Sequence, residues 1–210
     1  MRHTPEIRFF PDDSLDKVYH LEEVFEEIHE EQRQAPMIAV GLPEVADTLR
    51  GAERFLLTTH HNPDGDAVGS LLGLYHLLRA LGKTDIRCVV DDPLPRVYAK
   101  LPGAGVIEHV PPEPPEYDLA VIVDVAQFDR IGAAADCLDR DKSTLIIDHH
   151  LDPGPRGAVG LIDSSYAATG EMLAELYAEA DVPMSVEAAH CLYVAQITDT
   201  GGYRFSCSGL

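Results

Sequence analysis

The fold is decided by the stretch from Arg54 to Ser70, which reads RFLLTTHHNPDGDAVGS. Its first six residues form a mostly apolar run that is typical of a buried strand. A tight polar turn follows at once and holds one imidazole, His60, and two carboxylates, Asp64 and Asp66. Residues 67–81 then show the apolar spacing of a helix. A metal-binding group between strand and helix predicts a functional site at this end of the strand.

The same arrangement recurs further along the chain. Asp124 follows the apolar run 119–123, the sequence Asp148-His149-His150 follows the run 143–147, and Asp199 lies near the end. In α/β proteins, ligands collect beyond the carboxyl ends of parallel strands. Three separate parts of the chain are therefore expected on one rim, where they suggest a dinuclear metal centre.

The pattern of apolar runs predicts the fold class. Near-continuous apolar strands that alternate with helices indicate a parallel sheet covered on both faces. We predict an α/β, three-layer domain over residues 37–210, with a mostly parallel sheet covered by helices. The expected strands are 54–59, 85–90, 119–123, 143–147 and 159–162; the expected helices are 42–50, 67–81, 94–100, 131–138, 167–180 and 186–198.

Residues 1–36 differ from the rest and are predicted to be an acidic N-terminal helical arm. Six glutamates lie between residues 15 and 34, and Leu21, Val24, Phe25 and Ile28 recur at helical spacing. Such a helix would dock on the main domain or on another subunit. The alternative is a loosely held, solvated arm.

Composition limits the possible partners. The chain has 210 residues and a formal net charge of -20, which argues against a broad nucleic-acid-binding face because phosphates require Lys and Arg. A small phosphate substrate remains compatible with this charge, since bound divalent cations can make the local charge of a site positive. The sequence has no apolar run of 18 residues and no signal-peptide pattern, so we expect no membrane contact and a cytoplasmic location.

The candidate ligands favour hard divalent cations. Carboxylate oxygens bind such ions, and Mn and Co also accept neutral imidazole. We therefore expect Mn²⁺, with Mg²⁺ or Co²⁺ as substitutes. Cysteine is absent from the clusters, which argues against a structural zinc site. No CxxC pair occurs, so we assign neither a metal nor a disulfide to the cysteines, which are Cys88, Cys137, Cys191 and Cys207.

These motifs resemble a known family. The stretch His60-x-x-Pro63-Asp64-Gly65-Asp66, the isolated Asp124, Asp148-His149-His150 and Asp199-Thr200-Gly201 resemble the four motifs of the DHH phosphoesterase superfamily, in the family's order. The similarity covers about residues 54–206 and is greatest to the nanoRNase/pAp-phosphatase branch. Manganese-dependent pyrophosphatases usually carry Thr and Ser where this chain has Gly65 and Ala67. The family normally has a C-terminal DHHA1 domain with a Gly-Gly-Gly-His segment, and we expect this chain to lack it.

The resemblance implies a role for each motif residue. His60 and Asp64 would hold one metal, Asp66, His149 and Asp199 the other, and Asp124 would bridge the two. His150 would face the substrate phosphate and protonate the leaving group. Asp148 would orient a histidine ligand. The cations near the motifs, Arg130 and Arg204, are candidates for substrate binding, with surface ion pairs as the alternative.

The function that the resemblance implies is a divalent-metal-dependent phosphoesterase. It would hydrolyse short oligoribonucleotides or 3′-phosphoadenosine 5′-phosphate (pAp), with two metals that activate water. The alternatives are a manganese-dependent pyrophosphatase or exopolyphosphatase, and a catalytically idle nucleotide-binding module. Expected partners are a small nucleotide or short oligonucleotide, no long nucleic acid, and a possible second copy of the chain as a homodimer.

Three residues of the first motif have plainer interpretations. His61 matches no motif role. Asp66 could be the N-cap of the following helix. Gly69 is expected to allow close packing of that helix on the sheet, because no phosphate-loop pattern is present.

Overall fold

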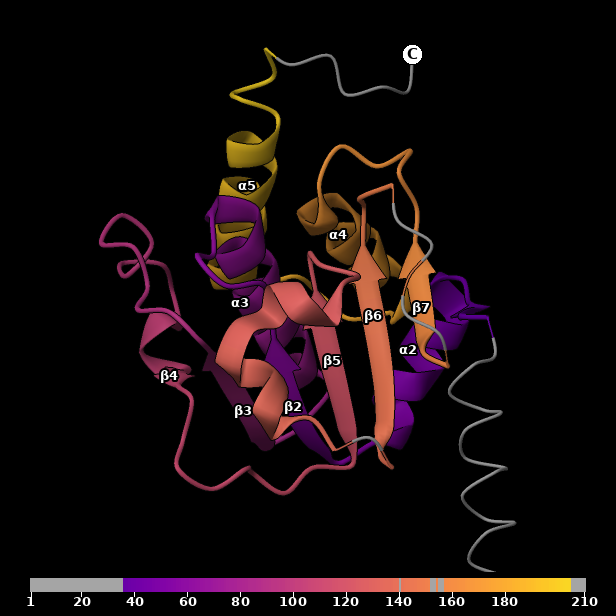
Figure 1. The fold of residues 1–210 in the computed structure, drawn as a ribbon. Helices are drawn as coiled ribbons and strands as arrows, with labels where there is room; N and C mark the ends of the chain where they lie inside the picture. Colours follow the sequence, from indigo (N-terminus) through magenta and orange to yellow (C-terminus); the bar gives the residue numbers. More distant parts are fainter. Residues whose placement is uncertain (1–35, 140, 152–153, 155–156, 205–210) are drawn as a thin grey trace, which may run out of the picture. The chain divides into compact units, whose positions relative to one another are not determined.

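A computed structural model describes residues 36–139, 141–151, 154 and 157–204. The predicted arm over residues 1–36 lies almost wholly outside these residues and stays a prediction. Within the described residues a seven-stranded sheet forms, in the order β1-β7-β6-β5-β2-β3-β4, and each pair of neighbours is parallel (Figure 1). The strands are β1 (Ile38–Ala39), β2 (Arg54–Thr58), β3 (Asp85–Val90), β4 (Ile107–His109), β5 (Leu119–Val123), β6 (Ser143–Asp148) and β7 (Val159–Ile162).

Helices cover the sheet in two layers. One face packs against four α-helices, and a 3₁₀ segment covers part of the other (Figure 1). The described helices are α2 (Leu42–Gly51), α3 (Gly65–Ala80), α4 (Thr169–Glu179) and α5 (Val186–Asp199), with 3₁₀ segments η1 (Ala104–Val106) and η2 (Phe128–Cys137). Adjacent strand residues enter opposite layers: Leu57 joins the core under the α-helices, whereas Leu56 joins the core under η2. The predicted three-layer α/β fold is confirmed.

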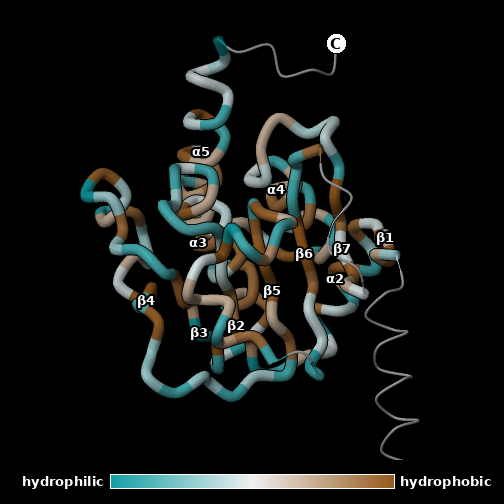
Figure 2. The backbone as a smooth tube through the Cα atoms, in the orientation of Figure 1, coloured by the Kyte–Doolittle hydropathy of each residue, from teal (hydrophilic) through white to brown (hydrophobic). Residues whose placement is uncertain are grey.

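The central strands form the apolar middle of the domain. All five residues of β5 are buried, and four of the five in β2. In Figure 2 the central strands are accordingly coloured mostly as hydrophobic residues. Cys88, Cys137 and Cys191 are buried free thiols. No helix of the described residues is long and apolar enough to cross a membrane.

Helices α3 and α5 pack at unusually short range. A Cβ atom on Gly69 would lie 2.5 Å from the carbonyl oxygen of Cys191 and 2.8 Å from the amide nitrogen of Ala195. Cβ atoms on Gly65 and Gly73 would likewise clash with α5 side chains. Our expectation that Gly69 allows close approach was right, but the partner is a helix and not the sheet.

Several expected elements differ in detail. Residues 96–100 form turns instead of the expected helix over 94–100, and residues 94 and 95 have no regular structure. Pro95 keeps the residue before it out of helical geometry. The helix expected over 131–138 is the 3₁₀ segment η2, which is kinked at Gly132, where φ is 69°. Helix α3 begins at Gly65, two residues earlier than expected, so that its N-cap is Asp64 and not Asp66.

Candidate metal centre

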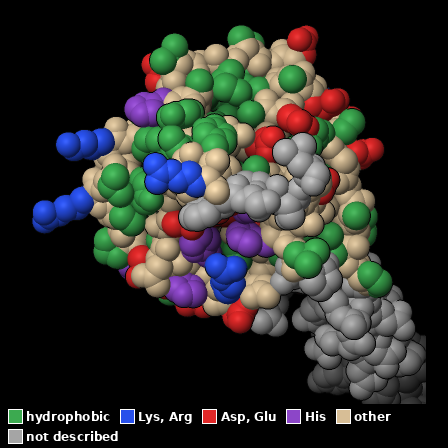
Figure 3. Space-filling model, turned by 90° about the horizontal axis from the view of Figure 1, so that it is seen from above, with side chains coloured by type: hydrophobic (Ala, Val, Ile, Leu, Met, Phe, Trp, Pro, Cys, Tyr) green, Lys and Arg blue, Asp and Glu red, His purple; other side chains and the backbone are tan. Residues whose placement is uncertain are grey.

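The motif residues meet at the carboxyl ends of three neighbouring strands. Strand β5 lies between β2 and β6. His60 follows β2, Asp124 follows β5 and His149 follows β6. Viewed onto this rim, histidine side chains gather beside acidic ones (Figure 3). The adjacency of these strands therefore brings together side chains that are up to 89 positions apart.

Six candidate ligands form two adjoining groups. The first group is His60, Asp64 and Asp124, and the second is Asp66, His149 and Asp199. A third group, Asp124, His149 and His150, overlaps both. In each group, one ligand atom per residue lies within 4.8 Å of the others. Helix α3 supplies Asp66 from its first turn, its N-cap supplies Asp64, and the last residue of α5 supplies Asp199. The six residues thus come from α3, α5 and the ends of β2, β5 and β6, which are five elements.

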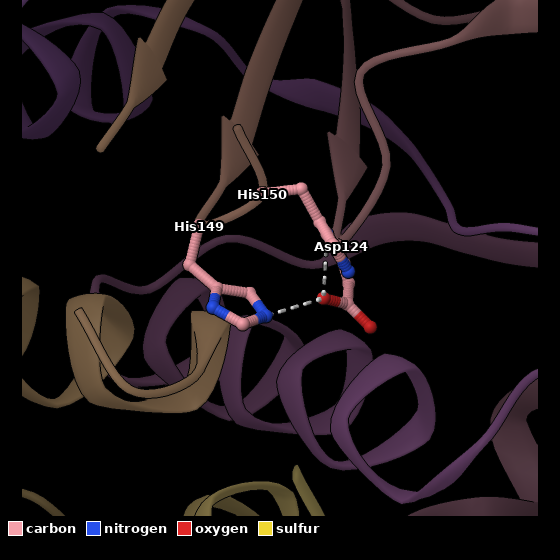
Figure 4. A group of neighbouring side chains, drawn as sticks. All are labelled: Asp124, His149 and His150. Atoms are coloured by element: carbon pink, nitrogen blue, oxygen red, sulfur yellow. Dashed lines mark ion pairs between the residues drawn. The ribbon is translucent and has the colours of Figure 1, made fainter. Parts of the chain in front are cut away.

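Asp124 belongs to the first group and also faces His149 of the second group. Its Oδ2 atom is 3.6 Å from His60 Nε2. Its Oδ1 atom is 3.8 Å from His149 Nε2 (Figure 4). Its backbone has a φ of 62°, in the left-handed region, which is costly for a residue with a side chain. The Asp124 amide donates to the carbonyl of Ile147 on β6. Such strain is typical of functional positions.

Backbone carbonyls fix the orientation of both histidines. His60 Nδ1 is 2.8 Å from the carbonyl of His61, and His149 Nδ1 is 3.3 Å from the carbonyl of Tyr166. Because a carbonyl only accepts, Nδ1 must carry the hydrogen in each ring. In the neutral ring, the lone pair of Nε2 then faces the carboxylates. This is the usual arrangement of a histidine that binds a metal.

The spacing of the donor atoms fits bound cations. Histidine–carboxylate distances of 3.6–3.9 Å are longer than hydrogen bonds. Two ligands that each lie about 2.0–2.2 Å from one ion can be up to about 4 Å apart. The Nε2 atom of His149 is buried without a hydrogen-bond partner, although three carboxylates surround it. A buried nitrogen whose lone pair has no hydrogen-bond partner is expected where a metal ion is the missing partner.

Among the described residues, the buried aspartates of the site lack a Lys or Arg partner. Burial raises the pKa of Asp124 well above its usual value, and the neighbouring Asp66 and Asp64 raise it further. Burial also raises the pKa of Asp66. Within the described part of the chain, no Lys or Arg forms an ion pair with the four aspartates of the two groups. Divalent cations would supply the missing positive charge, so the side chains fit divalent-metal binding.

Thr169, the first residue of α4, supports the site and was missed by the sequence analysis. Its buried hydroxyl donates to Asp124 Oδ1 at 3.0 Å, and its amide donates to Asp66 Oδ2 at 2.7 Å. The amide of Gly170 donates to Asp66 Oδ1. Asp66 therefore binds the N-terminus of α4, where the helix dipole favours negative charge.

His150 lies at the open side of the site, and 43% of its side chain is exposed. Its Nδ1 atom donates to Asp148 Oδ1 at 2.7 Å and lies 3.8 Å from Asp124 Oδ1. This hydrogen bond is the main reason why the pKa of His150 is raised. The buried Asp148 therefore orients His150. We expected it to orient a histidine ligand, but the Nδ1 atoms of the expected ligands His60 and His149 contact backbone carbonyls instead.

The two candidate arginines differ in position. Arg130 is half-buried in η2, and its charge acts on His150. Arg204 is exposed in the turns after α5, and its side chain has no ion pair or hydrogen bond with the described residues. The structure brings Arg130 to the edge of the candidate metal centre but does not bring Arg204 into it.

Comparisons with known proteins agree with this geometry. The model of the "DHH family, N-terminal domain" matches residues 54–196. The bifunctional oligoribonuclease and PAP phosphatase NrnA of Thermus thermophilus is 35% identical over 167 residues, which cover 77% of this chain and 48% of that protein. The protein of the same name from Bacillus subtilis is 28% identical, over 77% of this chain and 51% of its own length.

A solved structure is also similar. The crystal structure of an exopolyphosphatase-related protein from Bacteroides fragilis has a TM-score of 0.72 and 26% identity, and the match covers 80% of this chain and 52% of that one. The chain thus spans about half the length of the proteins that it matches.

Proposed function

The chain belongs to the DHH family, and from that premise we propose that it is a metal-dependent phosphoesterase. Its proposed substrates are phosphate esters of short oligoribonucleotides or pAp-like nucleotides. The names of the relatives support this substrate class. One observation carries the proposal: two groups of potential metal ligands, His60 with Asp64 and His149 with His150, share Asp124 at the rim of the sheet.

We propose that the catalytic domain spans residues 37–210 and holds two divalent ions, Mn²⁺ in preference to Mg²⁺ or Co²⁺. The first ion would bind His60 and Asp64, and the second would bind Asp66, His149 and Asp199. Asp124 would bind both. The four carboxylates carry a charge of -4 and two divalent ions carry +4, so the loaded site is close to neutral and accepts an anion.

When bound, a pair of divalent ions supplies Lewis acidity that polarises a phosphoryl group and lowers the pKa of water. Side chains of the protein are proposed to supply the proton and to bind the phosphate. Asp148 fixes His150 through Nδ1, so Nε2 of His150 is the atom proposed to donate a proton to the leaving oxygen. Arg130 is proposed to bind a phosphate oxygen through its fork of donors. Arg204 stays a second candidate for phosphate binding.

A substrate panel tests the proposal. The full chain, purified with Mn²⁺, would be assayed for product release from pAp, short oligoribonucleotides and pyrophosphate. We expect turnover of the nucleotides that disappears in Asp124→Ala, with a loss of bound metal in that variant. Absence of release from every nucleotide would refute a nucleotide phosphoesterase.

The structural likeness to an exopolyphosphatase-related protein favours one second candidate, a pyrophosphatase or exopolyphosphatase. Release from pyrophosphate or polyphosphate alone would select it. A metal-loaded protein that binds pAp without turnover would instead be an idle nucleotide-binding module. Light scattering in the same buffers would test the proposed homodimer.

A further inference from the structure

His61 joins two loops of the rim. Its amide donates to the carbonyl oxygen of Arg130 at 2.7 Å, and its Nδ1 atom lies 2.7 Å from the same oxygen. Because a carbonyl only accepts, Nδ1 must carry the hydrogen and donate. One residue thus makes two hydrogen bonds to one acceptor 69 positions away, although 61 is the position to which the family motif assigns nothing.

Neighbouring contacts hold the same loops. The amide of Asn62 donates to Asp92 Oδ2 at 2.7 Å, which ties the turn after β2 to the loop after β3. Gly132 has a φ of 69° and lies so close to Asp91 that any Cβ would clash with that carboxylate. The segment around Arg130 is therefore enclosed on both sides, with His61 as its direct hydrogen-bond donor.

The side chain of Arg130 is available for a ligand. In the part of the chain that the structure describes, its guanidinium has no carboxylate partner and no hydrogen bond. Its backbone carbonyl accepts two hydrogen bonds from His61, which directly follows the candidate ligand His60, so Arg130 lies at the edge of the candidate metal centre. A half-buried, unpaired guanidinium beside the candidate site is suited to a phosphate oxygen.

We propose that His61 is a positioning residue that holds Arg130 in place to bind the substrate phosphate beside His150. The inference rests on the proposed function and extends it to a residue outside the motifs. His61 acts through the backbone of Arg130, whereas the guanidinium makes the contact with the substrate.

A double-mutant cycle tests this role. The variants are His61→Ala, Arg130→Ala and the double variant, each loaded with Mn²⁺ and measured for the Kd, KM and kcat of pAp. Loss of a charged hydrogen bond predicts about a 10- to 100-fold higher KM for Arg130→Ala. For His61→Ala we expect a KM about 5- to 10-fold higher and little change in kcat, since a ground-state contact is weakened.

The cycle is informative because Arg130→Ala keeps the carbonyl that accepts from His61. If His61 acts through the guanidinium, His61→Ala in the Arg130→Ala background should change KM by less than about twofold. The variant His61→Asn should recover most of the affinity, because its Nδ2 can donate from nearly the place of Nδ1. His109→Ala is the matched control, since His109 is exposed on β4 and is expected to have no effect.

Metal content and melting temperature should match the wild type in all variants. Additive effects of the two substitutions, or a wild-type Kd and KM in His61→Ala, would overturn the positioning role while leaving the proposed function intact. A wild-type protein that neither binds nor hydrolyses pAp would overturn the proposed function, and the inference with it.

Discussion

Asp124 combines a strained backbone with a position between two groups of candidate ligands. The change Asp124→Asn preserves the shape of the side chain, and Asn tolerates a positive φ. Even outer partners of metal ligands cost about 10- to 100-fold in activity or affinity. We therefore expect turnover to fall below about one-hundredth of the wild type.

Elemental analysis should show fewer than two ions per chain in this variant, with an unchanged circular dichroism spectrum. A fully loaded, active Asp124→Asn protein would exclude the bridging role.

Thr169 gives a second test at the scale of one residue. Thr169→Val removes the hydroxyl that donates to Asp124 while it keeps the volume and the amide that binds Asp66. We expect Mn²⁺ affinity to fall by about 10- to 100-fold, measured by calorimetry. Thr48→Val is the matched control, because the exposed Thr48 hydroxyl bonds only to the carbonyl of Glu44 within its own helix, α2. Equal affinities in the two variants would contradict a supporting role.

The sequence predicted the side chains that meet at the rim because each lies in a short motif directly after an apolar run. Thr169 and His61 carry no such signal. Their contacts depend on which loop or helix end the fold places opposite them, and His61 bonds to a backbone carbonyl, which is present at every residue.

At the scale of elements, the contact between α3 and α5 depends on glycine. Gly69→Ala would place a Cβ 2.5 Å from the carbonyl oxygen of Cys191, and a backbone atom cannot move aside as a side chain can. We expect a loss of about 1–3 kcal/mol in the free energy of unfolding, as in other overpacked cores.

Urea unfolding of Gly69→Ala and Gly51→Ala tests this prediction. Gly51 ends α2, and a Cβ there would meet nothing within 4 Å, so its replacement should be neutral or slightly stabilising. A Gly69→Ala protein as stable as the wild type would show that the two helices can separate.

Secondary structure was predicted correctly where a continuous apolar run marked a strand. The strands β3, β5 and β7 have the bounds that their apolar runs predicted. The helix expected over residues 94–100 was wrong, since residues 96–100 form turns; a segment of seven residues is too short for its sequence to separate a helix from successive turns. The short strands β1 and β4 were missed, because two or three residues are too few to show a period.

At the scale of the domain, the metal centre should contribute to folding. Four crowded aspartates without a cation oppose the folded state, and a ligand that binds only the folded state at about 100 times its Kd adds about 2.7 kcal/mol. We expect Mn²⁺ to raise Tm by about 5–10 °C relative to protein treated with EDTA. Differential scanning calorimetry of the wild type and Asp124→Ala measures this, and the variant should show no shift. A wild-type Tm indifferent to Mn²⁺ would contradict the site.

The strand order was beyond sequence reasoning. Apolar runs indicated a parallel sheet, but the order β1-β7-β6-β5-β2-β3-β4 depends on how the crossovers pack, and no single segment encodes it. The rule that ligands gather at carboxyl ends of strands nevertheless predicted one rim, since it holds for any order of neighbouring parallel strands.

The glycine contacts between α3 and α5 have a consequence for ion selectivity. Asp66 lies on α3 and Asp199 on α5, and at Gly69 helix α3 packs directly against the backbone of α5. The gap between the two carboxylates is therefore set by main-chain contact and cannot easily widen for a bulkier cation. A calcium ion, which prefers longer bonds and more oxygens, should be a poor substitute, and enlarging residue 69 should alter the preferred ionic radius.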